Sequence, residues 1–155
     1  MKLAIVYTSI TGNTKELATI LGELIKGYDL DVQLFTIEEF PLWQLSHFDA
    51  VVVGTYTWGN GEIPGEMLPL YRAFENQDTH SIVTGVFGTG DQFYPHYCGA
   101  VDKFRDMLYV QSELAVTLKV ELTPQLQDLK RCRKFAELLM WRLRQNCPSG
   151  MNKIS

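Results

Sequence analysis

The chain has 155 residues, of which 46% are hydrophobic and 21% charged, and its formal net charge is −4. This composition fits a globular protein of one domain, and no apolar run is long enough for a membrane span. The first 122 residues hold 16 acidic and 7 basic side chains, whereas the rest hold 2 and 7. An acidic body argues against nucleic acid as a partner and favours partners with basic surfaces.

The cysteines and the start of the chain bear on its compartment. Cys98, Cys132 and Cys147 form neither a C-x-x-C pair nor a zinc-type spacing. Scattered thiols in odd number fit a reducing compartment, and the first strand pattern begins at once after Met1. We therefore expect a cytoplasmic protein without a signal peptide, a membrane role or a metal site.

Apolar runs alternate with helical patterns along the chain. Short, often β-branched runs predict strands at 2–7, 31–36, 49–54, 81–87 and 113–121. Helical periodicity predicts helices at 13–26, about 65–75, 98–109 and 125–145. The segment 38–46, which Pro41 interrupts, predicts only a weak helical turn or a loop.

The alternation of strands and helices predicts an α/β fold. We expect a five-stranded parallel sheet of order 2-1-3-4-5, with helices on both faces in a three-layer sandwich. One domain should span residues 1–145, followed by a tail at 146–155. Ligands of such sheets bind beyond the carboxyl ends of the strands, so informative residues should follow strands one, three and four.

A turn rich in hydroxyl groups follows the first strand and precedes the first helix. Its residues are Ser9, Ile10, Thr11, Gly12, Asn13 and Thr14. Backbone N–H groups at a helix N-terminus attract phosphate. The turn lacks the Gly-Lys-Ser/Thr ending of a triphosphate loop and the spaced glycines of a dinucleotide fingerprint. It favours a terminal monophosphate held by neutral donors; the alternative is a Ser/Thr-capped helix start.

Glycines and aromatic residues follow the third and fourth strands. Trp58 lies in the loop at 54–61 and Tyr94 in the loop at 88–99. Two exposed aromatic rings on neighbouring loops suit stacking on a flat ligand, although such residues also close the ends of sheets as part of a core. A phosphate and a planar ring describe a mononucleotide. Paired aromatics with weak cationic recognition favour a flavin.

The three loops together resemble those of short-chain flavodoxins, and the resemblance covers essentially residues 1–145. Ser9–Thr14 is similar to the phosphate motif T/S-x-T-G-x-T, and Thr57-Trp58-Gly59 to the first ring loop. The run from Gly90-Asp91 through Tyr94 to Cys98-Gly99-Ala100-Val101-Asp102 resembles the second ring loop. The uninterrupted fifth strand is typical of the short-chain type.

The resemblance implies a flavodoxin-like fold and a role for each matched residue toward a non-covalently bound FMN. Side chains of Ser9, Thr11, Asn13 and Thr14, with the N–H groups of Ile10 and Gly12, would hold the phosphate. Trp58 and Tyr94 would stack on the ring faces, the Gly59 peptide would face N5, and the Asn60 N–H would approach O4. The backbone of Asp91, His96 and Cys98 would meet the pyrimidine edge. Tyr56, Thr57, Thr89 and Gly90 complete the expected cofactor site.

The resemblance also implies an activity, which is low-potential one-electron transfer by a monomeric carrier that is not an enzyme. Its donor would be an NADPH-dependent reductase or a 2-oxoacid oxidoreductase, and its acceptors other redox enzymes. Three alternatives stay open: an FMN-dependent quinone or azo reductase, an activator of a manganese ribonucleotide reductase, and a flavin-free signalling domain. The last needs a phospho-accepting Asp after strand three, where this chain has Gly54-Thr55.

Overall fold

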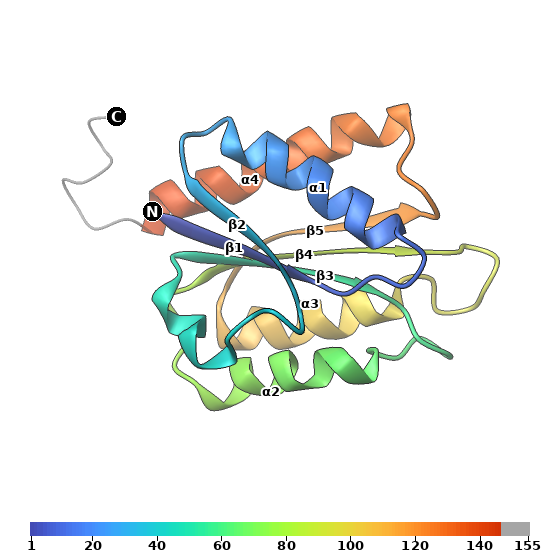
Figure 1. Cartoon of the computed structure of the whole chain (residues 1–155), viewed down its shortest axis with the longest axis horizontal. Helices are drawn as coiled ribbons and strands as arrows, with labels where there is room; N and C mark the ends of the chain where they lie inside the picture. The colour runs from blue at the N-terminus through green and yellow to red at the C-terminus, as the bar shows by residue number, and fades with distance from the viewer. Residues whose placement is uncertain (147–155) are drawn as a thin grey trace.

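A single parallel sheet organises the computed structural model, which describes residues 1–146. Its strands are β1 (Lys2–Tyr7), β2 (Asp31–Thr36), β3 (Ala50–Tyr56), β4 (Val83–Gly90) and β5 (Glu113–Glu121). Their order in the sheet is β2-β1-β3-β4-β5, and every neighbouring pair is parallel. The predicted fold is thereby confirmed, and the carboxyl ends of β1, β3 and β4 lie together at one edge (Figure 1).

Helices cover both faces of this sheet. They are α1 (Asn13–Lys26), α2 (Leu68–Asn76), α3 (Gly99–Gln111) and α4 (Leu129–Asn146). Helices α1 and α4 pack on one face, and α2 and α3 on the other, which gives three layers (Figure 1). Within residues 1–146, none of the helices has the length and apolar character that crossing a membrane requires. Of the predicted tail, Asn146 ends α4, and residues 147–155 lie outside the described part.

Strand β1 shows why the core has two halves. Leu3 and Ile5 pack with α1 and α4, whereas Ala4 and Val6 pack with α2 and α3. This alternation follows from the two-residue period of a strand that is covered on both faces. Full burial of each large aliphatic side chain contributes about 1.5–3 kcal/mol.

The ends of β3 and β4 correct the predicted boundaries. The two strands were expected to end at residues 54 and 87, but they stay paired through Tyr56↔Thr89. Gly88 is the reason, because a Cβ there would lie 2.5 Å from the carbonyl oxygen of Thr55. The glycine permits a close approach within the sheet and does not begin a turn. Tyr56, Thr89 and Gly90 are therefore strand residues that reach the edge of the site.

Short 3-10 turns account for the other differences from the predicted elements. Residues 38–46 were expected to form a weak turn, and the structure has the 3-10 helix η1 (Leu42–His47) there. The helices predicted from 65 and 125 begin with the 3-10 turns η2 (Gly65–Met67) and η3 (Leu126–Asp128). In η3 a carboxylate oxygen of Asp128 accepts the Gln125 N–H at 2.8 Å, which closes a capping box.

Candidate cofactor site

The phosphate turn, residues 9–14, connects β1 to α1, and its residues 10–12 are exposed. Gly12 is the residue that precedes α1, and its φ of 95° is a left-handed conformation that glycine adopts readily. The Ser9 hydroxyl oxygen accepts the N–H groups of Gly12 and Lys15 at 3.2 and 3.3 Å. Neither Thr11 nor Asn13 caps the helix, because the cap position is Gly12, which has no side chain. The local structure suits an anion at the start of α1.

Two side chains of the phosphate turn connect it to other segments. The hydroxyl of Thr14 is buried and lies 2.8 Å from the hydroxyl of Thr89 on β4. Asn13 accepts the hydroxyl of Thr123 at 2.9 Å through Oδ1, so its amide nitrogen remains a donor for a ligand. The loop after β5 therefore supports the turn, and no sequence motif marks Thr123 for this contact. Ile10 turns its side chain outward and is 67% exposed.

The first ring loop is a tight hairpin from Trp58 to Glu62. Trp58 and Glu62 exchange two backbone hydrogen bonds of 2.8 Å, and Gly59 and Gly61 have φ angles of 50° and 88°. The indole of Trp58 is 58% exposed, so it is not part of the core. A Cβ at Gly59 would meet no atom within 4 Å. The role of Gly59 is thus backbone freedom, which lets its peptide adopt more than one orientation.

The second ring loop, residues 91–98, holds non-glycine residues in unusual conformations. His96 and Cys98 have φ angles of 61° and 51°, a region that costs free energy for most side chains. Tyr94 is 65% exposed, so it too is excluded from the core. Burial raises the pKa of the Cys98 thiol to about 11, so this group stays protonated at neutral pH and is a packing residue.

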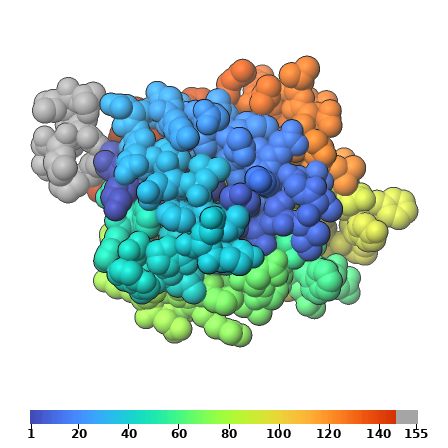
Figure 2. Space-filling model, in the orientation of Figure 1, coloured from blue at the N-terminus to red at the C-terminus, as the bar shows by residue number. Residues whose placement is uncertain are grey.

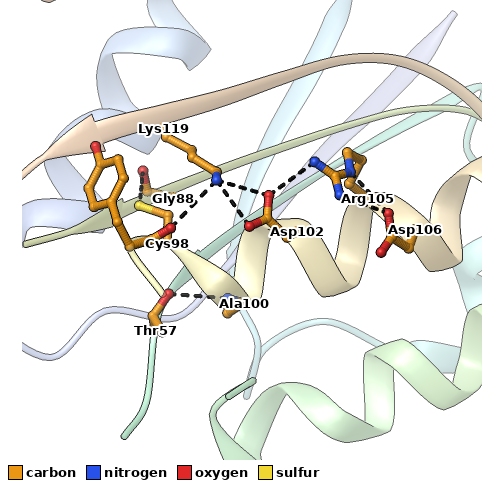
Figure 3. A network of polar contacts seen from close by, with 9 residues as sticks. Thr57, Gly88, Cys98, Ala100, Asp102, Arg105, Asp106 and Lys119 are labelled. Atoms are coloured by element: carbon orange, nitrogen blue, oxygen red, sulfur yellow. Dashed lines mark hydrogen bonds and ion pairs between the residues drawn. The ribbon is translucent and has the colours of Figure 1, made fainter. Parts of the chain in front are cut away.

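The two ring loops touch each other backbone to backbone. A Cβ at Gly99 would lie 2.7 Å from the Gly61 Cα, and a Cβ at Gly61 would lie 2.7 Å from the His96 Cβ. The Thr57 hydroxyl oxygen accepts the Ala100 N–H at 3.2 Å (Figure 3). Between the loops is a cleft of about 290 Å³, lined by Thr57, Gly59, Gly90, Asp91, Tyr94, Pro95, His96, Tyr97 and Cys98. Both loops protrude at the same side of the molecule (Figure 2).

Strand β5 supports the second ring loop from outside. The Lys119 ammonium donates to the Tyr97 carbonyl at 3.5 Å and contacts Asp102 at 2.9 Å (Figure 3). The Leu122 N–H donates to the Gly90 carbonyl at 2.7 Å. These supports join residues of distant parts of the chain, so no local pattern of the sequence reveals them.

Glu66 links the residue that follows β1 to the last residue of β3. One of its carboxylate oxygens accepts the Thr8 hydroxyl at 2.9 Å and the Tyr56 hydroxyl at 2.8 Å. Burial alone would raise the pKa of Glu66, but hydrogen bonds from its own backbone, Tyr56 and Thr8 lower it below the usual value. Burial and the Glu66 carboxylate raise the pKa of Tyr56 to about 12. The hydroxyl of Tyr56, a predicted cofactor residue, is therefore committed to Glu66.

The residues predicted for the cofactor all lie at the carboxyl edge of the sheet, but they occupy two positions. The side chains of Thr14, Thr89 and Cys98 are buried beneath the site. The side chains of Ile10, Trp58 and Tyr94 are exposed around it. Within residues 1–146, no cluster of His, Cys, Asp and Glu side chains is suited to a metal ion. The edge thus brings the turn before α1 together with two exposed aromatic loops, on a three-layer α/β fold.

Comparison with known proteins identifies the class. The family model for flavodoxin matches residues 5–135. The chain therefore belongs to the flavodoxin family, as a short-chain member. It is 37% identical over 145 residues to "Probable flavodoxin 1" of Bacillus subtilis, covering 90% of this chain and 91% of that protein. Members of this family are electron-transfer flavoproteins and not enzymes.

Solved structures agree with this assignment. Flavodoxin 2 from Bacillus cereus superposes with a TM-score of 0.86 at 33% identity, covering 92% of this chain and 99% of that one. A short-chain flavodoxin associated with a non-canonical PDU bacterial microcompartment gives a TM-score of 0.87 at 30% identity, again covering 92% and 99%.

Proposed function

We propose that this protein binds FMN non-covalently and carries single electrons at low potential between a reductase and other redox enzymes. The observation that supports this most directly is the convergence of three segments on one edge: the phosphate turn, the Trp58 hairpin and the Tyr94 loop. Bound FMN supplies reversible one-electron chemistry, and the protein supplies binding and orientation.

The phosphate turn would hold the terminal phosphate without a cationic side chain. The exposed Thr11 lies at the positive end of the helix dipole, where its hydroxyl can donate to a phosphate. Asn13 adds its amide nitrogen, because Thr123 occupies its oxygen. Recognition by neutral donors leaves the charge of the phosphate uncompensated, which disfavours a further negative charge on the nearby ring.

The two ring loops would cover the faces of the isoalloxazine. Trp58 and Tyr94 exclude water from the ring, and the peptide after Gly59 has the freedom to offer either its carbonyl or its N–H group toward N5. Backbone groups of Asp91, His96 and Cys98 would bind the pyrimidine edge. A hydrogen bond gained by the Gly59 peptide after one electron arrives would separate the two reduction steps, by about 1 kcal/mol or more.

Partners would dock transiently around the exposed edge of the ring loops. The acidic body favours donors and acceptors with basic surfaces, for which an NADPH-dependent reductase and a 2-oxoacid oxidoreductase are the candidate donors. We propose a monomeric, cytoplasmic carrier. Its association with such partners should weaken as salt concentration rises.

Stepwise anaerobic reduction of the purified protein, followed by its absorption spectrum, tests this proposal. We expect a yellow protein that is reduced in two resolved one-electron steps. Reduction in one two-electron step, or turnover of NADPH and a quinone without a partner reductase, would contradict the carrier function. A colourless protein that does not bind added FMN would contradict the flavin itself.

A substitution in the phosphate turn tests the assignment of the phosphate. Thr11→Val removes an exposed hydroxyl that has no hydrogen-bond partner within residues 1–146. We expect it to weaken FMN binding about 5- to 10-fold, while riboflavin, which lacks the phosphate, binds unchanged. Equal losses for the two ligands would refute the role of this turn.

A further inference from the structure

A groove runs along the outer edge of β5, between α3 and α4. It has a volume of about 390 Å³, and four consecutive residues of β5, 116–119, lie along it. Asp102 and Arg105 of α3 form one wall, and Arg131, Lys134, Phe135 and Leu138 of α4 form the other. The groove does not share a lining residue with the cleft of the ring loops.

The groove contains an available strand edge. Strand β5 pairs with β4 on one side, and within residues 1–146 no strand pairs with its other side. At the end of the groove the Lys119 carbonyl already accepts the guanidinium of Arg131. The preceding residues, Glu113–Val116, are all partly exposed. An unpaired strand edge accepts a further strand through its free N–H and C=O groups.

The charge of the groove is opposite to that of the molecule. Four cations line it, against one carboxylate. Arg105 contacts Asp102 and Asp106 at 3.1 and 3.0 Å, and Lys119 contacts Asp102 at 2.9 Å (Figure 3). Arg131 contacts Asp128 at 3.3 Å, so these three cations have partners within the chain. Lys134 forms no ion pair within the described residues. The walls also present Leu138, which is 37% exposed, beside Val116.

We propose that this groove binds an acidic, extended segment of a partner protein, which adds to β5 as a further strand. The strand edge supplies backbone hydrogen bonds, Val116 and Leu138 receive apolar side chains of the segment, and the unpaired Lys134 of α4 pairs with one of its carboxylates. At about 3.3 Å per residue, the four groove residues of β5 accommodate four or five residues of the partner. Since the ring loops stay uncovered, a partner held here leaves the electron-transfer edge free.

The test uses the full chain labelled with ¹⁵N and a synthetic seven-residue peptide of alternating Glu and Val, capped at both ends. We expect the largest amide shifts at residues 113–119, and binding that weakens at least about fivefold between about 0.05 and 0.5 M salt. A peptide of the same charge with Pro at its central position should bind about tenfold more weakly, because it cannot complete the strand pairing. Shifts confined to other surfaces, or equal binding of the Pro peptide, would overturn the proposal.

Variants separate this groove from general charge effects. The pair Arg105→Gln with Lys134→Glu should reduce the peptide affinity about tenfold. Lys134→Glu alone, which breaks no ion pair, should reduce it about threefold. The control pair Arg72→Gln with Lys26→Glu changes the net charge equally on exposed positions of α2 and α1 and should leave the affinity unchanged. Equal losses in both pairs would refute the site.

Self-association is the competing occupant of the groove. Sedimentation of the protein alone, at the concentrations used for the peptide, should show a monomer. A dimer that the Lys134→Glu variant abolishes would overturn the proposal in favour of a second copy of this chain. Reduction of the flavin-loaded variants is followed in parallel, and it should be unchanged, because the groove and the cofactor cleft are lined by different residues.

Discussion

The contact between Gly61 and Gly99 makes a sharp test of how the two ring loops depend on each other. In a Gly99→Ala variant the new methyl group would lie 2.7 Å from the Gly61 Cα and 2.8 Å from its carbonyl oxygen, where ordinary contacts begin at 3.4 Å. Both obstacles are backbone atoms, so no side chain can rotate away. The Trp58 hairpin must therefore move outward by about 0.7 Å.

The magnitude of the effect follows from this displacement. Overpacking of this kind costs about 1–3 kcal/mol. In the free protein the exposed hairpin can yield, whereas a bound flavin would hold both loops together. We therefore expect the strain to appear mainly as a loss of FMN affinity of about 5- to 150-fold.

Quenching of FMN fluorescence on titration measures this affinity, and urea unfolding of the flavin-free protein measures the stability. The matched control is Gly65→Ala at the start of η2, where an added Cβ meets no atom within 4 Å. Its FMN affinity should equal that of the parent protein. If Gly99→Ala also binds FMN within twofold of the parent protein, the ring loops do not act as a unit and the reasoning is refuted.

Three further predictions concern the supports beneath the site. Because hydrogen bonding lowers the pKa of Glu66 below its usual 4.5, its ionised form stabilises the fold above that pH. Glu66→Gln should lower the free energy of unfolding by about 1 kcal/mol at pH 7. The difference between variant and parent should vanish as acid protonates Glu66. A difference that does not change with pH in urea unfolding would contradict this. Thr14→Val should cost about 1–3 kcal/mol because it leaves the buried Thr89 hydroxyl unpaired. In the Thr14→Val background, Thr89→Val should lower the free energy of unfolding by less than it does in the parent protein. Equal losses in the two backgrounds would exclude a coupling between the two hydroxyls. In a Cys147→Ser variant, a thiol reagent at pH 7 should label Cys98 and Cys132 only after unfolding, because both are buried. Mass spectrometry measures the labelling, and fast labelling of the native protein would contradict the prediction.

Local patterns were sufficient to predict much of the fold. The bounds of β1, β2, β5 and α1 agree with the prediction, because a single strand or helix period governs each of them. The phosphate turn and the aromatic loops were found for a related reason, since each is a continuous run next to a strand. Their meeting at one edge followed from the parallel topology alone.

Contacts between residues far apart in the sequence could not be predicted from local sequence patterns. Glycines 88 and 90 suggested a turn after β4, whereas Gly88 permits close packing against β3. Glu66 lies 58 positions from Thr8, and Lys119 lies 22 from Tyr97, so neither contact follows a helical or strand period. The positive φ angles of His96 and Cys98 were likewise not predicted, because such angles are uncommon for any residue other than glycine.

The uneven distribution of charge gives this protein a permanent electric dipole. Cations gather on α4, while the remainder of the chain is predominantly acidic. In the field of a charged partner such a molecule experiences a torque as well as an attraction, so it rotates toward a preferred orientation before contact. Rotational diffusion thus becomes biased, and the fraction of collisions that present the correct edge rises without any added contact surface.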